Sequence, residues 1–159
     1  MKLRYLENHD TARSAQMIPE ETALLNWTAF LYFQKGMTLL YGGQEVGAVH
    51  RPGLFDKDDV VWNAGWDHSD LLRRLATLKR EPLLADSQYR VTALPRDILL
   101  ATHEKAGQKL IGIFSVQGNS SLVEIGLPDG CYENLITGDP VEVYAGRVGM
   151  DGTPIVIKV

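Results

Sequence analysis

The sequence of 159 residues is poor in cysteine and has no excess of basic residues. Its single cysteine, Cys131, excludes a disulfide scaffold and is typical of a reducing compartment, so we lean toward a cytoplasmic location. Sixteen lysines and arginines against 20 aspartates and glutamates give a net charge of −4, which disfavours a nucleic-acid partner. No apolar run approaches the ~18 residues of a membrane span. The first residues also lead into no apolar stretch, so we expect neither a membrane partner nor a signal peptide.

What is present is the composition of an ordinary globular protein, with 45% hydrophobic and 23% charged residues. The pattern changes near residue 90. Before that point strand-like and helix-like segments alternate, and after it only short strand-like runs occur between turn residues. We therefore predict two domains, residues 1–88 and residues 89–159, in a fold that combines α/β with all-β structure.

The first domain carries the pattern of a βαβ unit. The apolar runs Lys2–Leu6 and Met37–Tyr41 predict two strands. Residues 19–35 predict a helix between them, because Pro19 suits a first helical position and Gly36 a position just past a helix end. Two strands joined by such a crossover should be parallel.

A long irregular stretch, residues 48–67, follows and predicts a loop that is either functional or disordered. Asp56 and Asp58 alternate as calcium ligands would, but the series ends before a complete calcium-binding loop, so we expect a solvated acidic loop with no metal and no cofactor. A second helix is predicted over residues 69–80.

The second domain has six or seven strand candidates at regular spacing, which predict an antiparallel β-sandwich. Cys131 begins one of them and is expected to be a small buried hydrophobic residue. The candidates are Arg90–Leu94, Ile98–His103, Leu110–Phe114, Leu122–Ile125, Tyr132–Leu135, Val141–Val143 and Ile155–Val159.

Polar clusters follow both predicted parallel strands: Glu7-Asn8-His9-Asp10 after the first and Gly42-Gly43-Gln44-Glu45 after the second. In parallel α/β folds ligands bind beyond the carboxyl ends of the strands. Two carboxylates there, Asp10 and Glu45, suit glycoside hydrolysis, with one as the acid and the other as nucleophile or base. The spacing alone leaves open that these residues only cap loops and helices.

The identities of these residues carry more information than their spacing. Residues 4–10, Arg-Tyr-Leu-Glu-Asn-His-Asp, resemble the fourth signature region of the α-amylase family, glycoside hydrolase family 13, and Arg13 extends the match to Asn-His-Asp-x-x-Arg. Residues 36–47 resemble the family's eighth-strand pattern, with Thr38 in place of the usual proline. The loop that follows and the all-β tail are similar to the corresponding parts of the family.

The resemblance implies a fold. Residues 1–88 would be the last two strand–helix units of a (β/α)8 barrel, strands 7 and 8 with their helices, and residues 89–159 the antiparallel β-sandwich C-terminal domain. A complete barrel takes about 250 residues. The strands that carry the family's nucleophile and acid/base have no counterpart in this sequence.

The resemblance also implies roles for single residues. Asp10 would be the catalytic carboxylate that stabilises the oxocarbenium-like transition state. His9 and Asn8 would belong to the substrate-binding site, with His9 bonding to sugar hydroxyls. Arg13 would complete that site, more as a buttress of the loop than as a contact to the sugar. Glu45 would be a structural residue at the rim.

Three functions remain open. In the first, the chain is the C-terminal part of an α-glucan-active hydrolase or transglycosylase and is inactive alone. In the second, it is a non-catalytic carbohydrate- or partner-binding module. In the third, it is an oligomeric glycosidase that uses Asp10 and Glu45. For the first we expect an α-glucan or maltooligosaccharide as substrate of the intact enzyme, and self-association through unpaired barrel strands. Trp62 and Trp66 are expected to pack within the loop rather than to stack on sugar rings.

Overall fold

The first segment of the chain forms a short parallel strand pair with two helices between its strands. In the computed structural model, which describes residues 2–159, β1 (Leu3–Arg4) pairs in parallel with β2 (Met37–Thr38). The predicted βαβ arrangement is therefore confirmed, although each strand pairs over two residues instead of the predicted five. The helices are α1 (Ser14–Met17) and α2 (Glu21–Phe33), and the 3-10 helix η1 (Gln44–Val46) follows β2.

The helix α2 lies at the centre of the molecule and is buried around most of its circumference. It begins at Glu21, two residues after Pro19, and polar Asn26 is as completely buried as its apolar neighbours. The chain then turns at Gly36, which has a φ of 104°. A side chain at Gly36 would collide with the carbonyl oxygen of Lys2. Glycine is therefore required for β2 to approach β1 closely.

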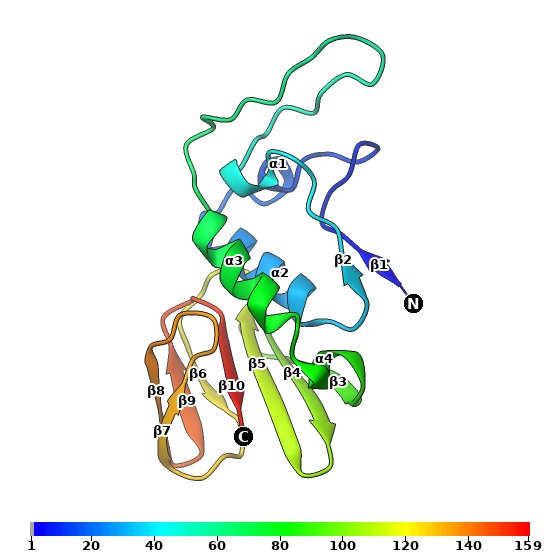
Figure 1. Ribbon diagram of the computed structural model, residues 1–159. Helices are drawn as coiled ribbons and strands as arrows, with labels where there is room; N and C mark the ends of the chain where they lie inside the picture. The colour runs from blue at the N-terminus through cyan, green and yellow to red at the C-terminus, as the bar shows by residue number, and fades with distance from the viewer. Residues whose placement is uncertain (1) are drawn as a thin grey trace.

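Residues 88–158 form two antiparallel four-stranded sheets, which confirms the predicted β-sandwich (Figure 1). The strand order is β10-β5-β4-β3 in the first sheet and β6-β9-β8-β7 in the second. The strands are β3 (Gln88–Leu94), β4 (Ile98–Lys105), β5 (Gln108–Ser115), β6 (Ser121–Glu124), β7 (Gly130–Glu133), β8 (Pro140–Tyr144), β9 (Arg147–Met150) and β10 (Ile155–Lys158).

One strand, β9, was not predicted. It follows a tight turn in which Ala145 and Gly146 both have positive φ angles, of 50° and 71°. Only Val148 and Met150 of β9 are buried, and Gly149 between them presents no side chain. The strand therefore shows a weak alternating pattern in the sequence, although its turn is of the type that favours hairpins.

Alternating side chains of β5 show how the layers are arranged. Leu110 and Phe114 pack with the helices, whereas Ile111 and Ile113 pack with the second sheet. The first sheet therefore lies between α2, α3 (Ser69–Leu78) and α4 (Pro82–Ala85) on one side and the second sheet on the other (Figure 1), with only its edge strand β3 largely exposed. The predicted boundary at residue 88 crosses a hydrophobic core that the helices and the sandwich share.

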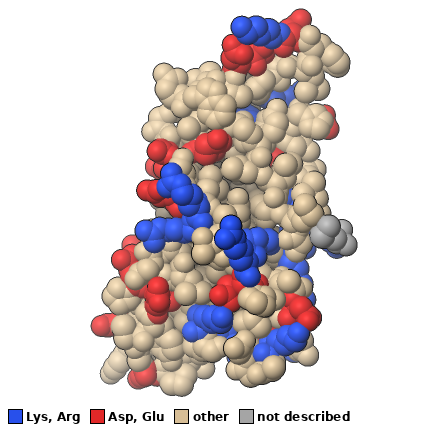
Figure 2. Space-filling model, viewed as in Figure 1, with Lys and Arg blue, Asp and Glu red and all other residues tan. Residues whose placement is uncertain are grey.

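The helix α3 confirms the second predicted helix, with Leu72, Leu75 and Leu78 buried against the core. It ends two residues earlier than predicted, and Pro82 begins the short helix α4 instead of only limiting α3. The irregular stretch 48–67 extends away from the helices at the end opposite the sandwich (Figure 1). Charges of both signs gather at its tip (Figure 2).

Cys131 corrects one prediction. It lies on β7 and is exposed rather than buried, because its side chain points to the outer face of the second sheet, opposite Glu142. Across residues 2–159, no helix combines the length and the apolar character that a membrane span requires.

Candidate functional site

The two polar clusters predicted from the sequence lie at the same end of the strand pair. The first follows β1 and the second follows β2, and parallel pairing brings both strand ends to one edge. Contacts between the segments fix this arrangement: Arg13 donates hydrogen bonds to the carbonyl oxygens of Gly42 and Ala48, each at 3.0 Å. The carboxyl ends of the strands thus form one candidate site, as in other parallel α/β folds.

A buried ion pair between Glu7 and Arg13 supports the loop of the first cluster. The Oε1 atom of Glu7 lies 3.1 Å from Nη1 of Arg13, and both residues are 0% exposed. The other oxygen, Oε2, accepts hydrogen bonds from the backbone N–H and the hydroxyl of Ser14, at 2.5 and 2.6 Å. Taking two charges out of water is costly unless they are paired and hydrogen-bonded. Here the charges are paired. Oε2 of Glu7 and the Nε and Nη2 atoms of Arg13 are hydrogen-bonded, whereas the facing atoms Oε1 and Nη1 meet only as an ion pair.

The guanidinium of Arg13 is enclosed on its other sides by the second cluster. Its carbon lies 4.9 Å from the centre of the Tyr41 ring, a distance typical of a cation–π contact. A side chain at Gly43, whose φ is 89°, would press against Nη2 of Arg13. Gly43 is therefore needed for this enclosure. Arg13 is placed where it holds the two strand ends together, with no exposed surface of its own.

Asn8, His9 and Asp10 form a turn that presents one carboxylate to solvent. The side-chain oxygen of Asn8 accepts the backbone N–H of Asp10 at 2.8 Å, and the Asn8 N–H donates to the hydroxyl of Thr11 at 2.9 Å. The side chain of Asp10 is 68% exposed, and its Oδ2 lies 3.3 Å from Nε2 of His9. Within residues 2–159, His9 is the only polar side-chain contact of this carboxylate. The carboxylate of Asp10 is therefore available to a ligand.

The long loop reaches back to this turn. Arg51 donates a hydrogen bond to the backbone carbonyl of Asp10 at 3.2 Å. Asp58 organises the loop, because its carboxylate accepts the N–H of Gly53 at 2.8 Å and lies 2.8 Å from Nε2 of His50. These two hydrogen bonds, that of Gly53 first, hold the pKa of Asp58 below its usual range. In the part of the chain that the structure describes, no three acidic, histidine or cysteine side chains gather as metal ligands would.

The two tryptophans of the loop differ in their surroundings. Trp66 is half-buried, stacks on the ring of His68 with centroids 5.4 Å apart, and lies directly over Gly47. Trp62 is 59% exposed, although its ring reaches the neighbourhood of Gly42. Trp66 therefore packs as expected, whereas the ring of Trp62 is largely exposed to solvent.

Glu45 is engaged in its own turn. Its Oε2 accepts the backbone N–H of Gly43 at 2.8 Å, and its carbonyl oxygen accepts the N–H of His68 at 2.8 Å. A carboxylate that stabilises a turn in this way has one oxygen occupied. Of the two carboxylates predicted at the strand ends, Asp10 alone has both side-chain oxygens free of backbone donors within the described residues.

Two residues of this site, Glu7 and Arg51, were not predicted from the sequence. Glu7 was assigned only to a polar cluster, and Arg51 only to the loop. An acidic and a basic residue on either side of a short turn, as Glu7 and Arg13 are, could have indicated an ion pair. The Arg51 contact to Asp10 spans 41 residues and has no local signal.

Comparisons with known proteins agree on one family. Residues 90–157 match the family described as the bacterial α-amylase C-terminal domain. The chain is 24% identical to an α-amylase of Saccharomycopsis fibuligera over 138 residues, which is 82% of this chain and 27% of that protein. It is 23% identical to α-amylase 1 of Schwanniomyces occidentalis, covering 86% of this chain and 28% of that protein.

Solved structures extend the match to the segment before residue 90. An α-amylase from Lactobacillus plantarum is 35% identical and superposes with a TM-score of 0.93 over 99% of this chain. A maltogenic α-amylase from Thermotoga neapolitana shares the fold, with a TM-score of 0.76, 20% identity and the same coverage of this chain. The chain spans 38% and 41% of these two proteins, and about a quarter of the two curated relatives.

Proposed function

Since the chain belongs to the α-amylase family, glycoside hydrolase family 13, and corresponds to the C-terminal part of its members, we propose that it contributes Asp10 to an α-glucan-active hydrolase or transglycosylase. The observation that supports this most is the state of the Asp10 carboxylate. It is 68% exposed at the carboxyl end of a parallel strand, on a loop that a buried ion pair supports. Alone, the chain is inactive.

In this proposal residues 1–88 are strands 7 and 8 of a (β/α)8 barrel with their helices, and residues 89–159 are the C-terminal domain. The parallel pairing of β1 with β2 supports the assignment, since barrel strands are parallel and joined through helices. Large apolar side chains near the pair are exposed, among them Leu3 at 56% and Met37 at 51%. Such side chains would be covered by the neighbouring strands and helices of a closed barrel.

Asp10 would stabilise the positive charge that develops on the sugar ring as the glycosidic bond breaks. His9, which is exposed beside it, would bond to hydroxyls of the same sugar. Asn8 would keep the turn in shape through its bond to the Asp10 N–H, and Arg13 would act as a buttress from beneath. The substrate of the intact enzyme would be an α-glucan or a maltooligosaccharide.

Inactivity of the chain alone follows from the chemistry of glycoside hydrolysis. A retaining enzyme needs a nucleophile and an acid/base whose carboxyl groups lie about 5–5.5 Å apart. In our proposal both of these carboxylates belong to other strands of the barrel. Glu45 does not replace them, because its carboxylate accepts a backbone N–H of its own turn.

The experiment is a chimera. The matching 38% of the Lactobacillus plantarum α-amylase is replaced by this chain, and starch hydrolysis is measured for the chain alone, for the chimera and for the chimera with Asp10→Asn. We expect no turnover by the chain alone and turnover by the chimera. Loss of one electrostatic stabiliser should lower kcat by about 10²–10³-fold.

The matched control is Asp59→Asn, which neutralises an exposed carboxylate of the loop and should leave kcat unchanged. An Asp10→Asn chimera as active as its parent would contradict the role of Asp10. Turnover by the chain alone that Glu45→Gln abolishes would instead support an oligomeric glycosidase that uses Asp10 and Glu45.

A further inference from the structure

The second sheet of the sandwich has one face that no segment within residues 2–159 covers. Its inner face carries buried valines, such as Val148, that pack against the first sheet. The register places Tyr144 beside Arg147 and Leu122 beside Gly149 on the opposite face. Tyr144 is 81% exposed and Leu122 is 62% exposed. Two large, exposed side chains on one open sheet face, Leu122 on β6 and Tyr144 on β8, with β9 between them, indicate a contact surface.

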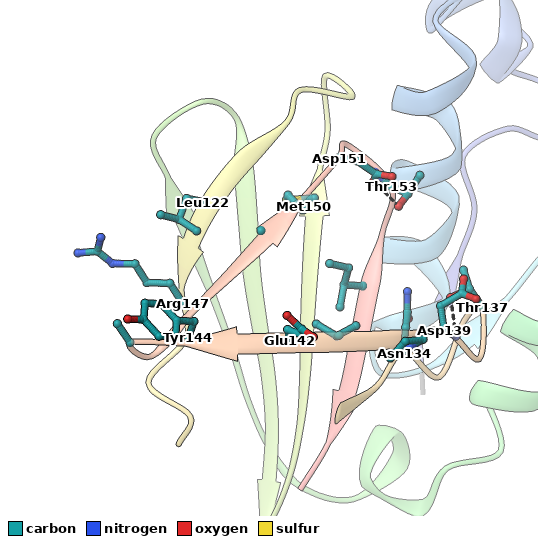
Figure 3. A pocket seen from close by; sticks show the side chains of 15 residues that line it. Leu122, Asn134, Thr137, Asp139, Glu142, Tyr144, Arg147, Met150, Asp151 and Thr153 are labelled. Atoms are coloured by element: carbon teal, nitrogen blue, oxygen red, sulfur yellow. Dashed lines mark hydrogen bonds between the residues drawn. The ribbon is translucent and has the colours of Figure 1, made fainter. Parts of the chain in front are cut away.

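A groove of about 730 Å³ crosses this face. It forms because β8 and β9 pair only next to their connecting turn and then diverge, as Figure 3 shows between Glu142 and Met150. Beneath the divergence lies an apolar floor to which the buried residues Val141, Met150 and Ile155 contribute. Tyr144 stands at one end of the groove and Asp139 at the other, and the side chain of Arg147, beside Tyr144, extends outward from that end (Figure 3).

Several polar groups around the groove already have partners. The side chain of Asn134 donates to the carbonyl of Pro154 and accepts two backbone N–H groups. The carboxylate of Asp151 accepts the N–H and the hydroxyl of Thr153 at 2.9 and 2.6 Å. These groups shape the groove and leave little bonding capacity for a ligand.

Three exposed groups on this face differ from them. Within residues 2–159, the side chains of Glu142, Tyr144 and Arg147 make no hydrogen bond or ion pair, although all three point outward from adjacent positions. A carboxylate, a phenol and a guanidinium of this kind offer acceptors and donors around an aromatic ring. A strongly charged ligand would meet one charge of its own sign here, whereas a neutral ligand would not.

We propose that this groove binds an oligosaccharide, with a pyranose ring stacked on Tyr144 and its hydroxyls bonded to Glu142 and Arg147. Pyranoses combine an apolar face with a ring of hydroxyls, which matches an aromatic ring surrounded by polar groups. That the oligosaccharide is an α-glucan rests on the proposed function. The groove lies in the sandwich, whereas Asp10 belongs to the loop beyond β1, so it is a second site for the chain.

Gly149 makes the groove testable without damage to the fold. No atom outside its chain neighbours lies within 4 Å of a Cβ atom added there, and its backbone conformation is not in the left-handed region. Gly149→Leu can therefore be accommodated and would fill the groove between Leu122 and β8. Tyr144→Ala removes the stacking ring, and because Tyr144 is so exposed its loss should leave the fold intact.

The experiment is calorimetric titration of the full chain with maltoheptaose. We expect binding by the wild type and an affinity at least tenfold weaker for both Tyr144→Ala and Gly149→Leu, with unchanged Tm. The control Phe55→Ala removes another exposed aromatic ring, 96% exposed on the loop, and should bind as the wild type does. Unchanged affinity in both groove variants, or no binding of any oligosaccharide by the wild type, would overturn the proposal.

Two further measurements separate this site from the catalytic proposal. Asp10→Asn should leave maltoheptaose affinity unchanged, and a loss of binding in that variant would move the ligand away from the groove. If cello-oligosaccharides bind and Tyr144→Ala weakens their binding, while maltoheptaose does not bind, the groove is a sugar site. The ligand is then not an α-glucan. Cys131, exposed opposite Glu142 on the same face, gives a positional readout: bound sugar should slow its reaction with a thiol reagent.

Discussion

β1 and β2 pair over two residues each, whereas β4 and β5 pair over eight. The difference extends to side chains: Leu3 and Met37 are more than half exposed, while Leu110 and Ile113 are completely buried. The central strands β4 and β5 of the sandwich thus pair along their whole length within the chain, and β5 buries most of its side chains. The parallel pair makes only a short ladder and leaves large apolar side chains exposed, and we attribute this to its dependence on other strands of the proposed barrel.

The largest expected effect concerns the ion pair that stiffens the poorly paired region. Arg13→Met leaves the buried carboxylate of Glu7 without a cation, and such a change costs about 3–5 kcal/mol. Urea unfolding measures this free energy. The same substitution at exposed Arg51 should cost less than about 0.5 kcal/mol. A loss of stability in Arg13→Met no larger than that of Arg51→Met would show that the pair does not support the fold.

A smaller effect is expected where the two regions meet. The buried amide of Asn26 in α2 accepts the N–H of Ser115 at 2.7 Å and donates to the carbonyl of Gly152 at 2.6 Å. Asn26→Ala should lower the free energy of unfolding by up to about 3 kcal/mol, because two buried backbone groups lose their partner. The control is Asn63→Ala on the exposed loop. Equal stability of the two variants would mean that the regions are not coupled through Asn26.

His103 links the regions as well and gives a pH dependence. It is fully buried, its Nε2 lies 2.9 Å from the carbonyl oxygen of Phe33, and burial lowers its pKa to about 4. The unfolded chain, with a histidine pKa near 6.5, binds more protons between these values. Stability is therefore fully present above pH 6.5 and is lost as the pH falls toward 4.

The expected loss is about 2 kcal/mol between pH 6.5 and pH 5, measured by urea unfolding. His103→Gln should remove most of this slope, whatever its effect at neutral pH. His9→Gln, at an exposed histidine, should retain it. A slope that persists in His103→Gln would assign the pH dependence to other groups.

The smallest change in stability, but a distinct change in behaviour, is expected at the strand edges. Unpaired edges with exposed apolar side chains favour pairing with another chain, so the isolated protein should self-associate at micromolar concentration. Met37→Lys on β2 should shift it toward the monomer in light scattering. Val91→Lys, on the edge strand β3 of the sandwich, should not. A wild type that stays monomeric would contradict the expected self-association.

Much of the fold could be predicted because its signals are local. Alternation and turn residues located seven of the strands of the sandwich, and helical spacing located α2 and α3. The missed strand β9 shows the limit. Its turn at Ala145 has the same φ of 50° as the turn at Ala106, which joins two of the predicted strands. The outer face of the second sheet is open to solvent, so the residues of β9 on that face, such as Gly149, add no apolar side chains to the sequence pattern.

The candidate site was predictable only in part. The motif of residues 8–10 is contiguous in the sequence, so its position at a strand end could be inferred. The burial of Glu7 and the contact of Arg51 depend on how distant segments meet, and no local pattern encodes that. Cys131 was misplaced for a related reason: a strand position is buried or exposed according to which face the sheet covers, which only tertiary packing decides.

Hydrogen exchange tests most directly whether the strand pair depends on further strands while the sandwich does not. The amides of Met37 and Leu39 donate to the carbonyl oxygens of Lys2 and Arg4, and those of Ile111 and Ile113 lie in the central strand β5. In the chain alone we expect rapid exchange at the first two and slow exchange at the last two. In the chimera with the Lactobacillus plantarum enzyme all four should exchange slowly. Protection of Met37 and Leu39 in the monomeric chain as strong as that of Ile111 would contradict the dependence.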